Sequence, residues 1–226
     1  MNSELFDGGP FAAVPAERHP LEPFLPEGAR ILMLGSFPPP RARWSMDFYY
    51  PNFINDMWRI MGLLFYGERS HFVDGSGRRF DRGRIAEFCT ERGIALYDTA
   101  TAVRRLKENA SDKFLEVVEP TDVGALLRRI PECRAVAVTG EKAAQTVLLS
   151  LGGASHSVPR IGSCVEFRFE GRVMQLWRMP SSSRAYPLAL EEKAGHYGRM
   201  FADLGLLTAG CNGQLRPTAD NGRRQI

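Results

Sequence analysis

A loop rich in proline and aromatic residues follows the first apolar run of the chain and carries groups that could bind a flat ring. Ile31–Leu34 is continuously apolar, as expected for a strand buried on both faces, and Gly35–Pro40 ends it abruptly. The aromatic run Phe48–Tyr50 could stack on a ring, and the carboxamide of Asn55 could orient a water molecule or read a base edge. Because active sites of α/β proteins lie where strands end, we expect this loop to border one.

The same residues also permit a purely structural interpretation. Pro38–Pro40 have fixed backbone angles and could simply reverse the chain, Asn55 could cap a helix, and the aromatic cluster could be core. The loop lacks the later glycines of a dinucleotide-binding turn, and proline has no amide hydrogen to donate to a pyrophosphate. Together with the lack of a Walker motif, this argues against a nucleotide cofactor held by such loops.

Polar residues follow three further predicted strands, so we expect them at the same edge of the sheet. They are Asp98, Thr139 and the loop Ser181–Arg184. Hydroxyls, free amides and a cation together suit phosphate binding, although a serine turn followed by an exposed arginine is the structural alternative. The chain has no G-x-S-x-G nucleophile elbow, which argues against a serine hydrolase.

Hydrophobic periodicity predicts strands that alternate with helices. The predicted strands are Ile31–Leu34, Ile94–Tyr97, Ala135–Val138, Val165–Phe169 and Val173–Trp177, the last two joined by a hairpin at Glu170-Gly171. The predicted helices begin near Asn52, Arg82, Thr121, Glu141 and Pro187, with Asn52 and Thr121 as caps. This order predicts an α/β protein with a mostly parallel sheet covered on both faces.

Length and composition predict one ordinary globular domain. Of the 226 residues, 44% are hydrophobic and 24% charged, with neither a run long enough to span a bilayer nor a signal-peptide pattern. We expect an irregular arm over residues 1–27, a single domain over 28–207 and a loose polar tail over 208–226. We further expect a cytoplasmic monomer that does not bind membranes.

Charge and cysteine usage narrow the function only slightly. The net charge of +3 permits binding to nucleic acid without arguing for it. Cys89, Cys133, Cys164 and Cys211 stand singly, without a C-x-x-C pair, so neither a zinc ribbon nor an iron–sulfur cluster is expected. We predict no metal site.

Four motifs combine into a recognisable order. They are Gly35-Ser-Phe-Pro38, Tyr50-Pro-Asn-Phe-Ile-Asn-Asp-Met-Trp-Arg-Ile60, Gly93-Ile-Ala-Leu-Tyr-Asp98 and Met179-Pro-Ser-Ser-Ser183. In order and spacing, over roughly residues 28–205, they resemble the uracil-DNA glycosylase superfamily. The first motif looks closest to the hypoxanthine-DNA glycosylase branch, and the serine loop to the mismatch-specific thymine/uracil branch.

The resemblance implies a three-layer α/β/α sandwich with a short, mostly parallel central sheet. It also implies an enzyme that cuts the bond between a damaged base and its deoxyribose, in duplex or single-stranded DNA, without a cofactor. By position in the motifs, the catalytic candidates are Asn55 and Asp98. The base-binding candidates are Gly35, Ser36, Phe37, Tyr49, Tyr50 and Thr139, and the DNA-binding candidates are Pro38, Pro39, Ser181, Ser182, Ser183 and Arg184, with Tyr186 as the alternative wedge.

The sequence departs from the superfamily pattern at three positions. Phe37 replaces the catalytic asparagine of the mismatch-specific branch, Met179 the histidine of classical uracil enzymes, and Thr139 an asparagine that reads the base edge in many members. Two alternatives to a DNA-base glycosylase therefore remain. One is a catalytically weak member that binds damaged DNA, and the other is a protein of this fold whose ligand is RNA, a nucleoside or another base-like molecule.

Overall fold

A five-stranded sheet forms the centre of the computed structural model, which describes residues 14–106, 115–151 and 157–207. Its strands, in spatial order, are β3 (Ile94–Asp98), β2 (Ile31–Gly35), β6 (Ala135–Thr139), β8 (Arg172–Met179) and β7 (Ser163–Phe169). The first four run parallel and only β7 is antiparallel. The predicted α/β class with a mostly parallel sheet is confirmed.

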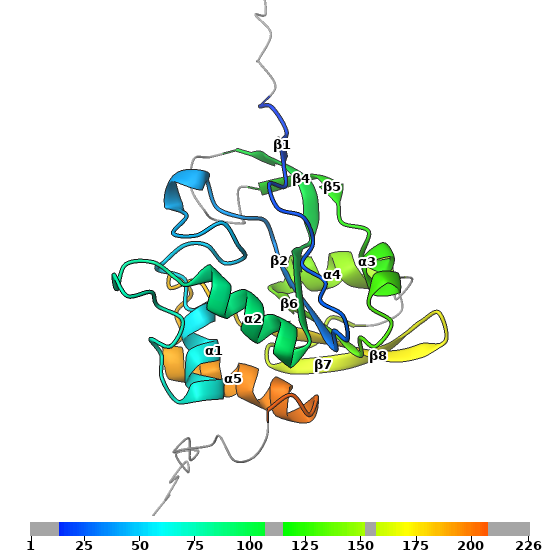
Figure 1. Cartoon of the computed structure of the whole chain (residues 1–226). Helices are drawn as coiled ribbons and strands as arrows, with labels where there is room; N and C mark the ends of the chain where they lie inside the picture. The colour runs from blue at the N-terminus through cyan, green and yellow to red at the C-terminus, as the bar shows by residue number, and fades with distance from the viewer. Residues whose placement is uncertain (1–13, 107–114, 152–156, 208–226) are drawn as a thin grey trace, which may run out of the picture.

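Five α-helices cover the two faces of this sheet. They are α1 (Met57–Tyr66), α2 (Arg82–Arg92), α3 (Val123–Arg129), α4 (Glu141–Ser150) and α5 (Leu190–Asp203), with a 3₁₀ turn, η1, at Arg41–Arg43. Helices α1, α2 and α5 lie on one side and α3 and α4 on the other (Figure 1), which confirms the three layers. No helix in the described segments is long and apolar enough to cross a bilayer.

A second, antiparallel sheet was not predicted from the sequence. It contains β1 (Glu17–Arg18), β4 (Ala100–Arg105) and β5 (Leu115–Pro120) in the order β1-β4-β5, and it lies at one end of the central sheet (Figure 1). Five of the six β5 residues are exposed, so the strand lacks the alternating pattern that sequence analysis relies on. The predicted tail, 208–226, and residues 1–13 of the predicted arm lie outside the described residues.

Two predicted helix starts are wrong because local polar contacts replace the first helical turn. Asn52 does not cap α1; its Oδ1 accepts a hydrogen bond from the Ile54 amide (3.1 Å), and the helix begins only at Met57. Pro187 likewise precedes α5: the Leu188 amide donates to the Tyr186 carbonyl (2.8 Å), and the helix begins only at Leu190. Residues between each predicted start and the observed helix, such as Asn55 before α1 and Leu188 before α5, line pockets instead.

The predicted Thr121 cap is also wrong. The side chain of Asp122 caps α3 by accepting a hydrogen bond from the Ala125 amide (2.9 Å), whereas the Thr121 hydroxyl donates to the carbonyl of Asp98 (2.7 Å).

The hairpin prediction is confirmed: Glu170 and Gly171, between β7 and β8, both have positive φ (47° and 81°), as a tight two-residue turn requires.

A buried ion pair joins α1, α5 and the serine loop. Lys193 of α5 is 1% exposed and its Nζ lies 2.9 Å from Asp56 Oδ2 and 2.8 Å from the Ser183 carbonyl oxygen. The Asp56 amide in turn donates to the Ser182 carbonyl (2.9 Å). Both charges are thus partnered inside the protein, as burial requires.

Replacing Lys193 with methionine should lower the free energy of unfolding by about 3–5 kcal/mol, because the buried Asp56 carboxylate loses its principal counter-charge. Urea denaturation of wild type and variant measures this. The control is the double variant Lys193→Met with Asp56→Leu, which should recover most of the loss because no buried charge remains. A single variant within about 1 kcal/mol of wild type would contradict this assignment.

Candidate active site

A cleft of about 620 Å³ lies where the parallel strands end, and every site residue predicted from the sequence lines it. The lining comes from β2 and the proline loop, the segment before α1, the ends of β3 and β6, and the serine loop after β8. In the predicted set these residues are Gly35, Ser36, Phe37, Pro38, Pro39, Tyr49, Tyr50, Asn55, Asp98, Thr139, Ser181, Ser182, Ser183 and Arg184. Their convergence is observed, whereas their chemical roles remain predictions.

The register of β2 against β3 places the Asp98 carboxylate beside a glycine. Gly35 and Asp98 are Cα partners in the parallel ladder. A Cβ atom at position 35 would lie 2.2 Å from Asp98 Oδ1, closer than any real contact. Glycine is therefore required at position 35 by the neighbouring carboxylate, and not by its own backbone angles. The Asp98 side chain can line the cleft in this position only because residue 35, at the end of β2, has no side chain.

A histidine from the N-terminal segment holds this carboxylate. His19 Nε2 lies 2.8 Å from Asp98 Oδ2, and its Nδ1 lies 2.8 Å from the Leu21 carbonyl oxygen. Because an ionised carboxylate can only accept, Nε2 carries the hydrogen in this pair. The His19 side chain is 2% exposed and its ring packs against Phe37 and Tyr97. Asp98 is thus fixed in orientation from outside the central sheet.

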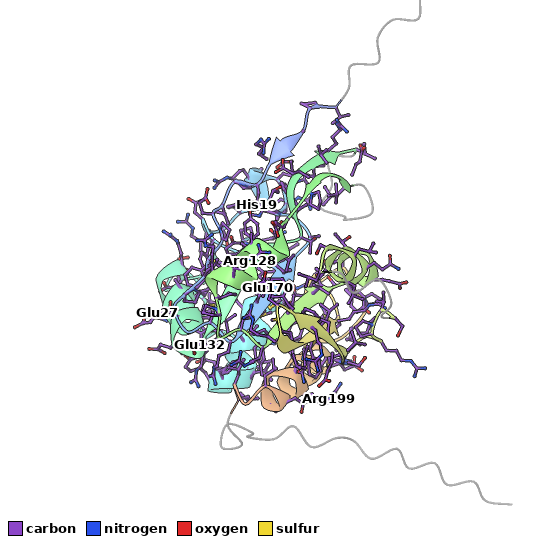
Figure 2. All side chains as sticks on the ribbon, turned by 90° about the vertical axis from the view of Figure 1, so that its right-hand side faces the viewer. His19, Glu27, Arg128, Glu132, Glu170 and Arg199 are labelled. Carbon is purple, nitrogen blue, oxygen red and sulfur yellow. The ribbon has the colours of Figure 1, made fainter. Side chains whose placement is uncertain are left out.

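The segment that carries His19 runs along the edge strand β3. The His19 amide donates to the Thr101 carbonyl (2.8 Å), and Phe24 forms an antiparallel bridge with Leu96. Figure 2 shows His19 near the small sheet, and Glu27 near Glu132 toward the other end of the strands. No residue type or spacing in this segment predicts chemistry. His19 is 79 residues from Asp98, and no local pattern marks it.

Two tyrosines form an aromatic wall that stays uncharged. Burial, with a smaller contribution from the nearby Asp98 charge, raises the pKa of Tyr49 well above its ordinary value; burial also raises that of Tyr50. The Tyr49 hydroxyl donates to the Glu22 carbonyl (2.7 Å), but no described residue accepts from the Tyr50 hydroxyl. Tyr50 also has a left-handed backbone (φ 50°), a strain that is common at functional sites. Tyr50 is the phenol available to a ligand.

A helix that began at Asn52 would place Asn55 in its first turn, but Asn55 lies before α1. Its Oδ1 accepts a hydrogen bond from the Met57 amide (2.9 Å), and its carbonyl accepts one from Arg59 (2.9 Å). The side chain therefore has a structural role at the start of the helix. With the oxygen occupied, the Nδ2 amino group is the part of the carboxamide that can bind a ligand in the cleft.

Hydrogen bonds within the serine loop fix its shape. Ser181 Oγ accepts from the Ser183 amide (3.2 Å), and Ser183 Oγ accepts from the Ala185 amide (3.3 Å). Each hydroxyl still has its own hydrogen to donate. Arg184, whose side chain is half exposed, reaches back to Asp56 with Nε 3.5 Å from Oδ1. The loop therefore presents hydroxyl donors and one cation to the cleft.

Phe37, Met179 and Thr139, the residues that depart from the superfamily pattern, differ in whether they can donate a hydrogen bond. Met179 is 1% exposed and Phe37 is 7% exposed, packed with Ala100, Val103 and Leu115 in a small separate core. Neither side chain can donate a hydrogen bond, whereas the hydroxyl of Thr139 can. Among the described residues, no group of three or more His, Cys, Asp or Glu side chains is arranged to hold a metal ion.

The fold of this protein is similar to that of known structures. No family model and no curated protein matches the chain, but 25 chains of solved structures do. One is the solution NMR structure of a "putative Uracil DNA glycosylase" from Methanosarcina acetivorans, which is 22% identical with a TM-score of 0.57. The match covers 84% of this chain and 99% of that one. The protein therefore has the fold of that uracil-DNA glycosylase-like structure.

Proposed function

We propose that the protein is a DNA-base glycosylase that hydrolyses the N-glycosidic bond of a flipped-out deaminated base and leaves an abasic site. Candidate bases are uracil, hypoxanthine and mismatched thymine. The observation that carries the proposal is the convergence of the four sequence motifs on a single cleft. In order and spacing the motifs resemble those of the uracil-DNA glycosylase superfamily, and the chain has the fold of a structure described as a "putative Uracil DNA glycosylase".

The cleft suits a single extruded nucleotide. Its volume of about 620 Å³ is in the range of small-molecule sites, and its walls combine aromatic rings with a few polar groups. A base that leaves the duplex loses its stacking partners, and the tyrosine wall offers a replacement surface. Hydroxyls of the serine loop and the cation of Arg184 lie at the same opening, where they can contact the strand.

Cleavage of a glycosidic bond creates a cationic sugar and a leaving base that carries negative charge. In the proposed mechanism, the Asp98 carboxylate stabilises the cationic sugar, orients the attacking water and accepts the proton that the water loses. His19 keeps this carboxylate in place. Asn55 Nδ2 and the Tyr50 hydroxyl provide donors for the departing base. All these groups belong to the chain, so the mechanism needs no cofactor.

The second candidate function is binding of damaged DNA without base release. It is favoured by the apolar side chains of Phe37 and Met179 at positions where relatives in the superfamily use an amide or an imidazole. Tight, salt-sensitive binding to lesion-containing duplexes without an abasic product would support it.

A substrate panel separates these functions. Purified protein should release one base from duplexes that contain uracil, hypoxanthine, xanthine or mismatched thymine, detected as strand cleavage after alkali. The same oligomers made as single strands or RNA, together with free nucleosides, define the ligand class. If the protein binds these oligomers but cleaves none of them, the second candidate function, binding of damaged DNA, is supported and the glycosylase proposal is wrong. Activity confined to nucleosides or RNA would exclude a role in DNA repair.

Asn55 variants should separate the structural role of this residue from its catalytic role. Asn55→Asp keeps an oxygen that can accept from the Met57 amide but removes the donor, whereas Asn55→Ala removes both. We expect both variants to lose base release by about 10²–10³-fold in single turnover, as for loss of a transition-state donor. Only Asn55→Ala should also lose thermal stability. Full activity in Asn55→Asp would remove the amide from the mechanism.

Asp98 and His19 should behave as a unit. Asp98→Asn should lower base release by about 10²–10⁴-fold, and His19→Ala by about 10–100-fold, because the carboxylate remains but is less well oriented. The double variant should be no worse than Asp98→Asn alone. His71→Ala is the control, since this ring stacks on Tyr66 and does not line the cleft. Losses that multiply in the double variant would show that His19 acts independently of Asp98.

A further inference from the structure

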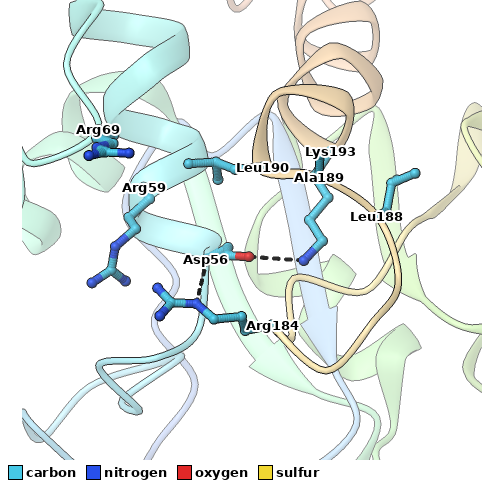
Figure 3. A pocket seen from close by; sticks show the side chains of 8 residues that line it. All are labelled: Asp56, Arg59, Arg69, Arg184, Leu188, Ala189, Leu190 and Lys193. Carbon is cyan, nitrogen blue, oxygen red and sulfur yellow. Dashed lines mark hydrogen bonds and ion pairs between the residues drawn. The ribbon is translucent and has the colours of Figure 1, made fainter.

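A second pocket, of about 510 Å³, lies on the other side of the serine loop from the cleft. Its lining residues are Asp56, Arg59, Arg69, Arg184, Leu188, Ala189, Leu190 and Lys193 (Figure 3). Arg184 is common to both pockets. The carbonyls of Ser182 and Ser183 face this side, where they accept from the Asp56 amide and from Lys193. The two pockets therefore adjoin at Arg184, directly after the serines that line the cleft.

The pocket has an excess of positive charge. Four basic residues and one carboxylate line it, and that carboxylate, Asp56, is already paired with Lys193 at 2.9 Å. The pKa of Arg59 is lowered, first by burial and then by the neighbouring Arg184 cation, with a further contribution from Arg69. The lining thus brings like charges together without enough internal counter-charge.

The basic groups differ in how firmly they are held. Arg59 is fixed: its Nη1 donates to the carbonyls of Phe53 (2.7 Å) and Asn55 (2.9 Å), and its guanidinium lies over two aromatic rings. The described residues supply acceptors for only two of the three N–H groups of Lys193. No described residue pairs with the exposed Arg69. Arg69 and one N–H group of Lys193 therefore have no acceptor among the described residues.

We propose that this pocket binds a phosphate group of the nucleic-acid strand whose base enters the neighbouring cleft. Guanidinium groups bind phosphate through paired, charge-assisted hydrogen bonds, and a phosphate supplies the missing negative charge. Since the two pockets share Arg184, one strand can occupy both at once, with its base on one side of the serine loop and a phosphate on the other. The choice of a strand phosphate, as opposed to a free one, rests on the proposed function.

The phosphate site is tested first without DNA. Inorganic phosphate, titrated against sodium chloride at matched ionic strength, should bind the wild-type protein and raise its melting temperature. Arg69→Ala should weaken this binding by about tenfold, as expected for one charge-assisted contact. Arg129→Ala is the matched control, because Arg129 is an exposed arginine at the end of α3 and lines neither pocket. Equal phosphate affinity in wild type and Arg69→Ala, or no binding, overturns the site.

The source of the phosphate is tested with modified DNA. Neutral methylphosphonate linkages are placed one at a time on each side of the lesion, and binding is measured under conditions that prevent turnover. One linkage should weaken wild-type binding by about tenfold and leave Arg69→Ala unaffected, because the contact is already lost. If every linkage affects both proteins equally, the strand phosphate is overturned. If no DNA binds the wild type, the proposed function and the strand phosphate both fail, while the inorganic phosphate titration still decides whether the pocket is an anion site.

Discussion

The geometry of the cleft depends on the buried ion pair between Asp56 and Lys193, which joins α1, α5 and the serine loop. Burying two charges costs several kcal/mol each unless they are paired and hydrogen-bonded. Here they are: Lys193 also donates to the Ser183 carbonyl, and the Asp56 amide donates to the Ser182 carbonyl. The partners lie 137 residues apart in sequence. The pair therefore fixes the serine loop, whose three serines line the cleft, against α1 and α5.

The side of the cleft formed by β2 and β3 depends on a close approach of Asp98 to the backbone of residue 35, which only glycine permits. Parallel pairing of β2 with β3 sets Gly35 against Asp98, and the missing Cβ leaves room for the carboxylate. Thr121 then holds the Asp98 backbone and His19 its side chain, so residues from separate segments restrain a single group. Such restraint matters for catalysis, because a group that is already oriented need not reorganise as charge develops.

Structure can be predicted from this sequence best where one physical rule applies to many residues at once. Buried parallel strands appear as apolar runs, and their carboxyl ends meet at one edge, so the convergence of Asp98, Thr139 and the serine loop could be predicted without coordinates. The capping prediction for Thr121 failed because its hydroxyl has a tertiary partner, which no local pattern reveals. His19 was missed for the same reason. The small sheet was missed because β1 has only two residues and β5 is largely exposed, so neither shows periodicity.

The proposed strand would have its sugar in the cleft and a phosphate in the second pocket, and the charged residues of the two pockets suit this placement. A carboxylate near a phosphate would oppose binding, yet the proposed reaction requires negative charge near the sugar as it becomes cationic. In this protein the Asp98 carboxylate lies in the cleft beside uncharged phenols, with Arg43 and Arg184 also in the lining. The second pocket has the larger excess of cations, with four basic residues and one carboxylate. Arg184 lines both the cleft and the second pocket. A strand bound with its base in the cleft would meet the carboxylate at the reacting sugar and the arginines at its backbone, so that each charge in the protein opposes the complementary charge in the ligand.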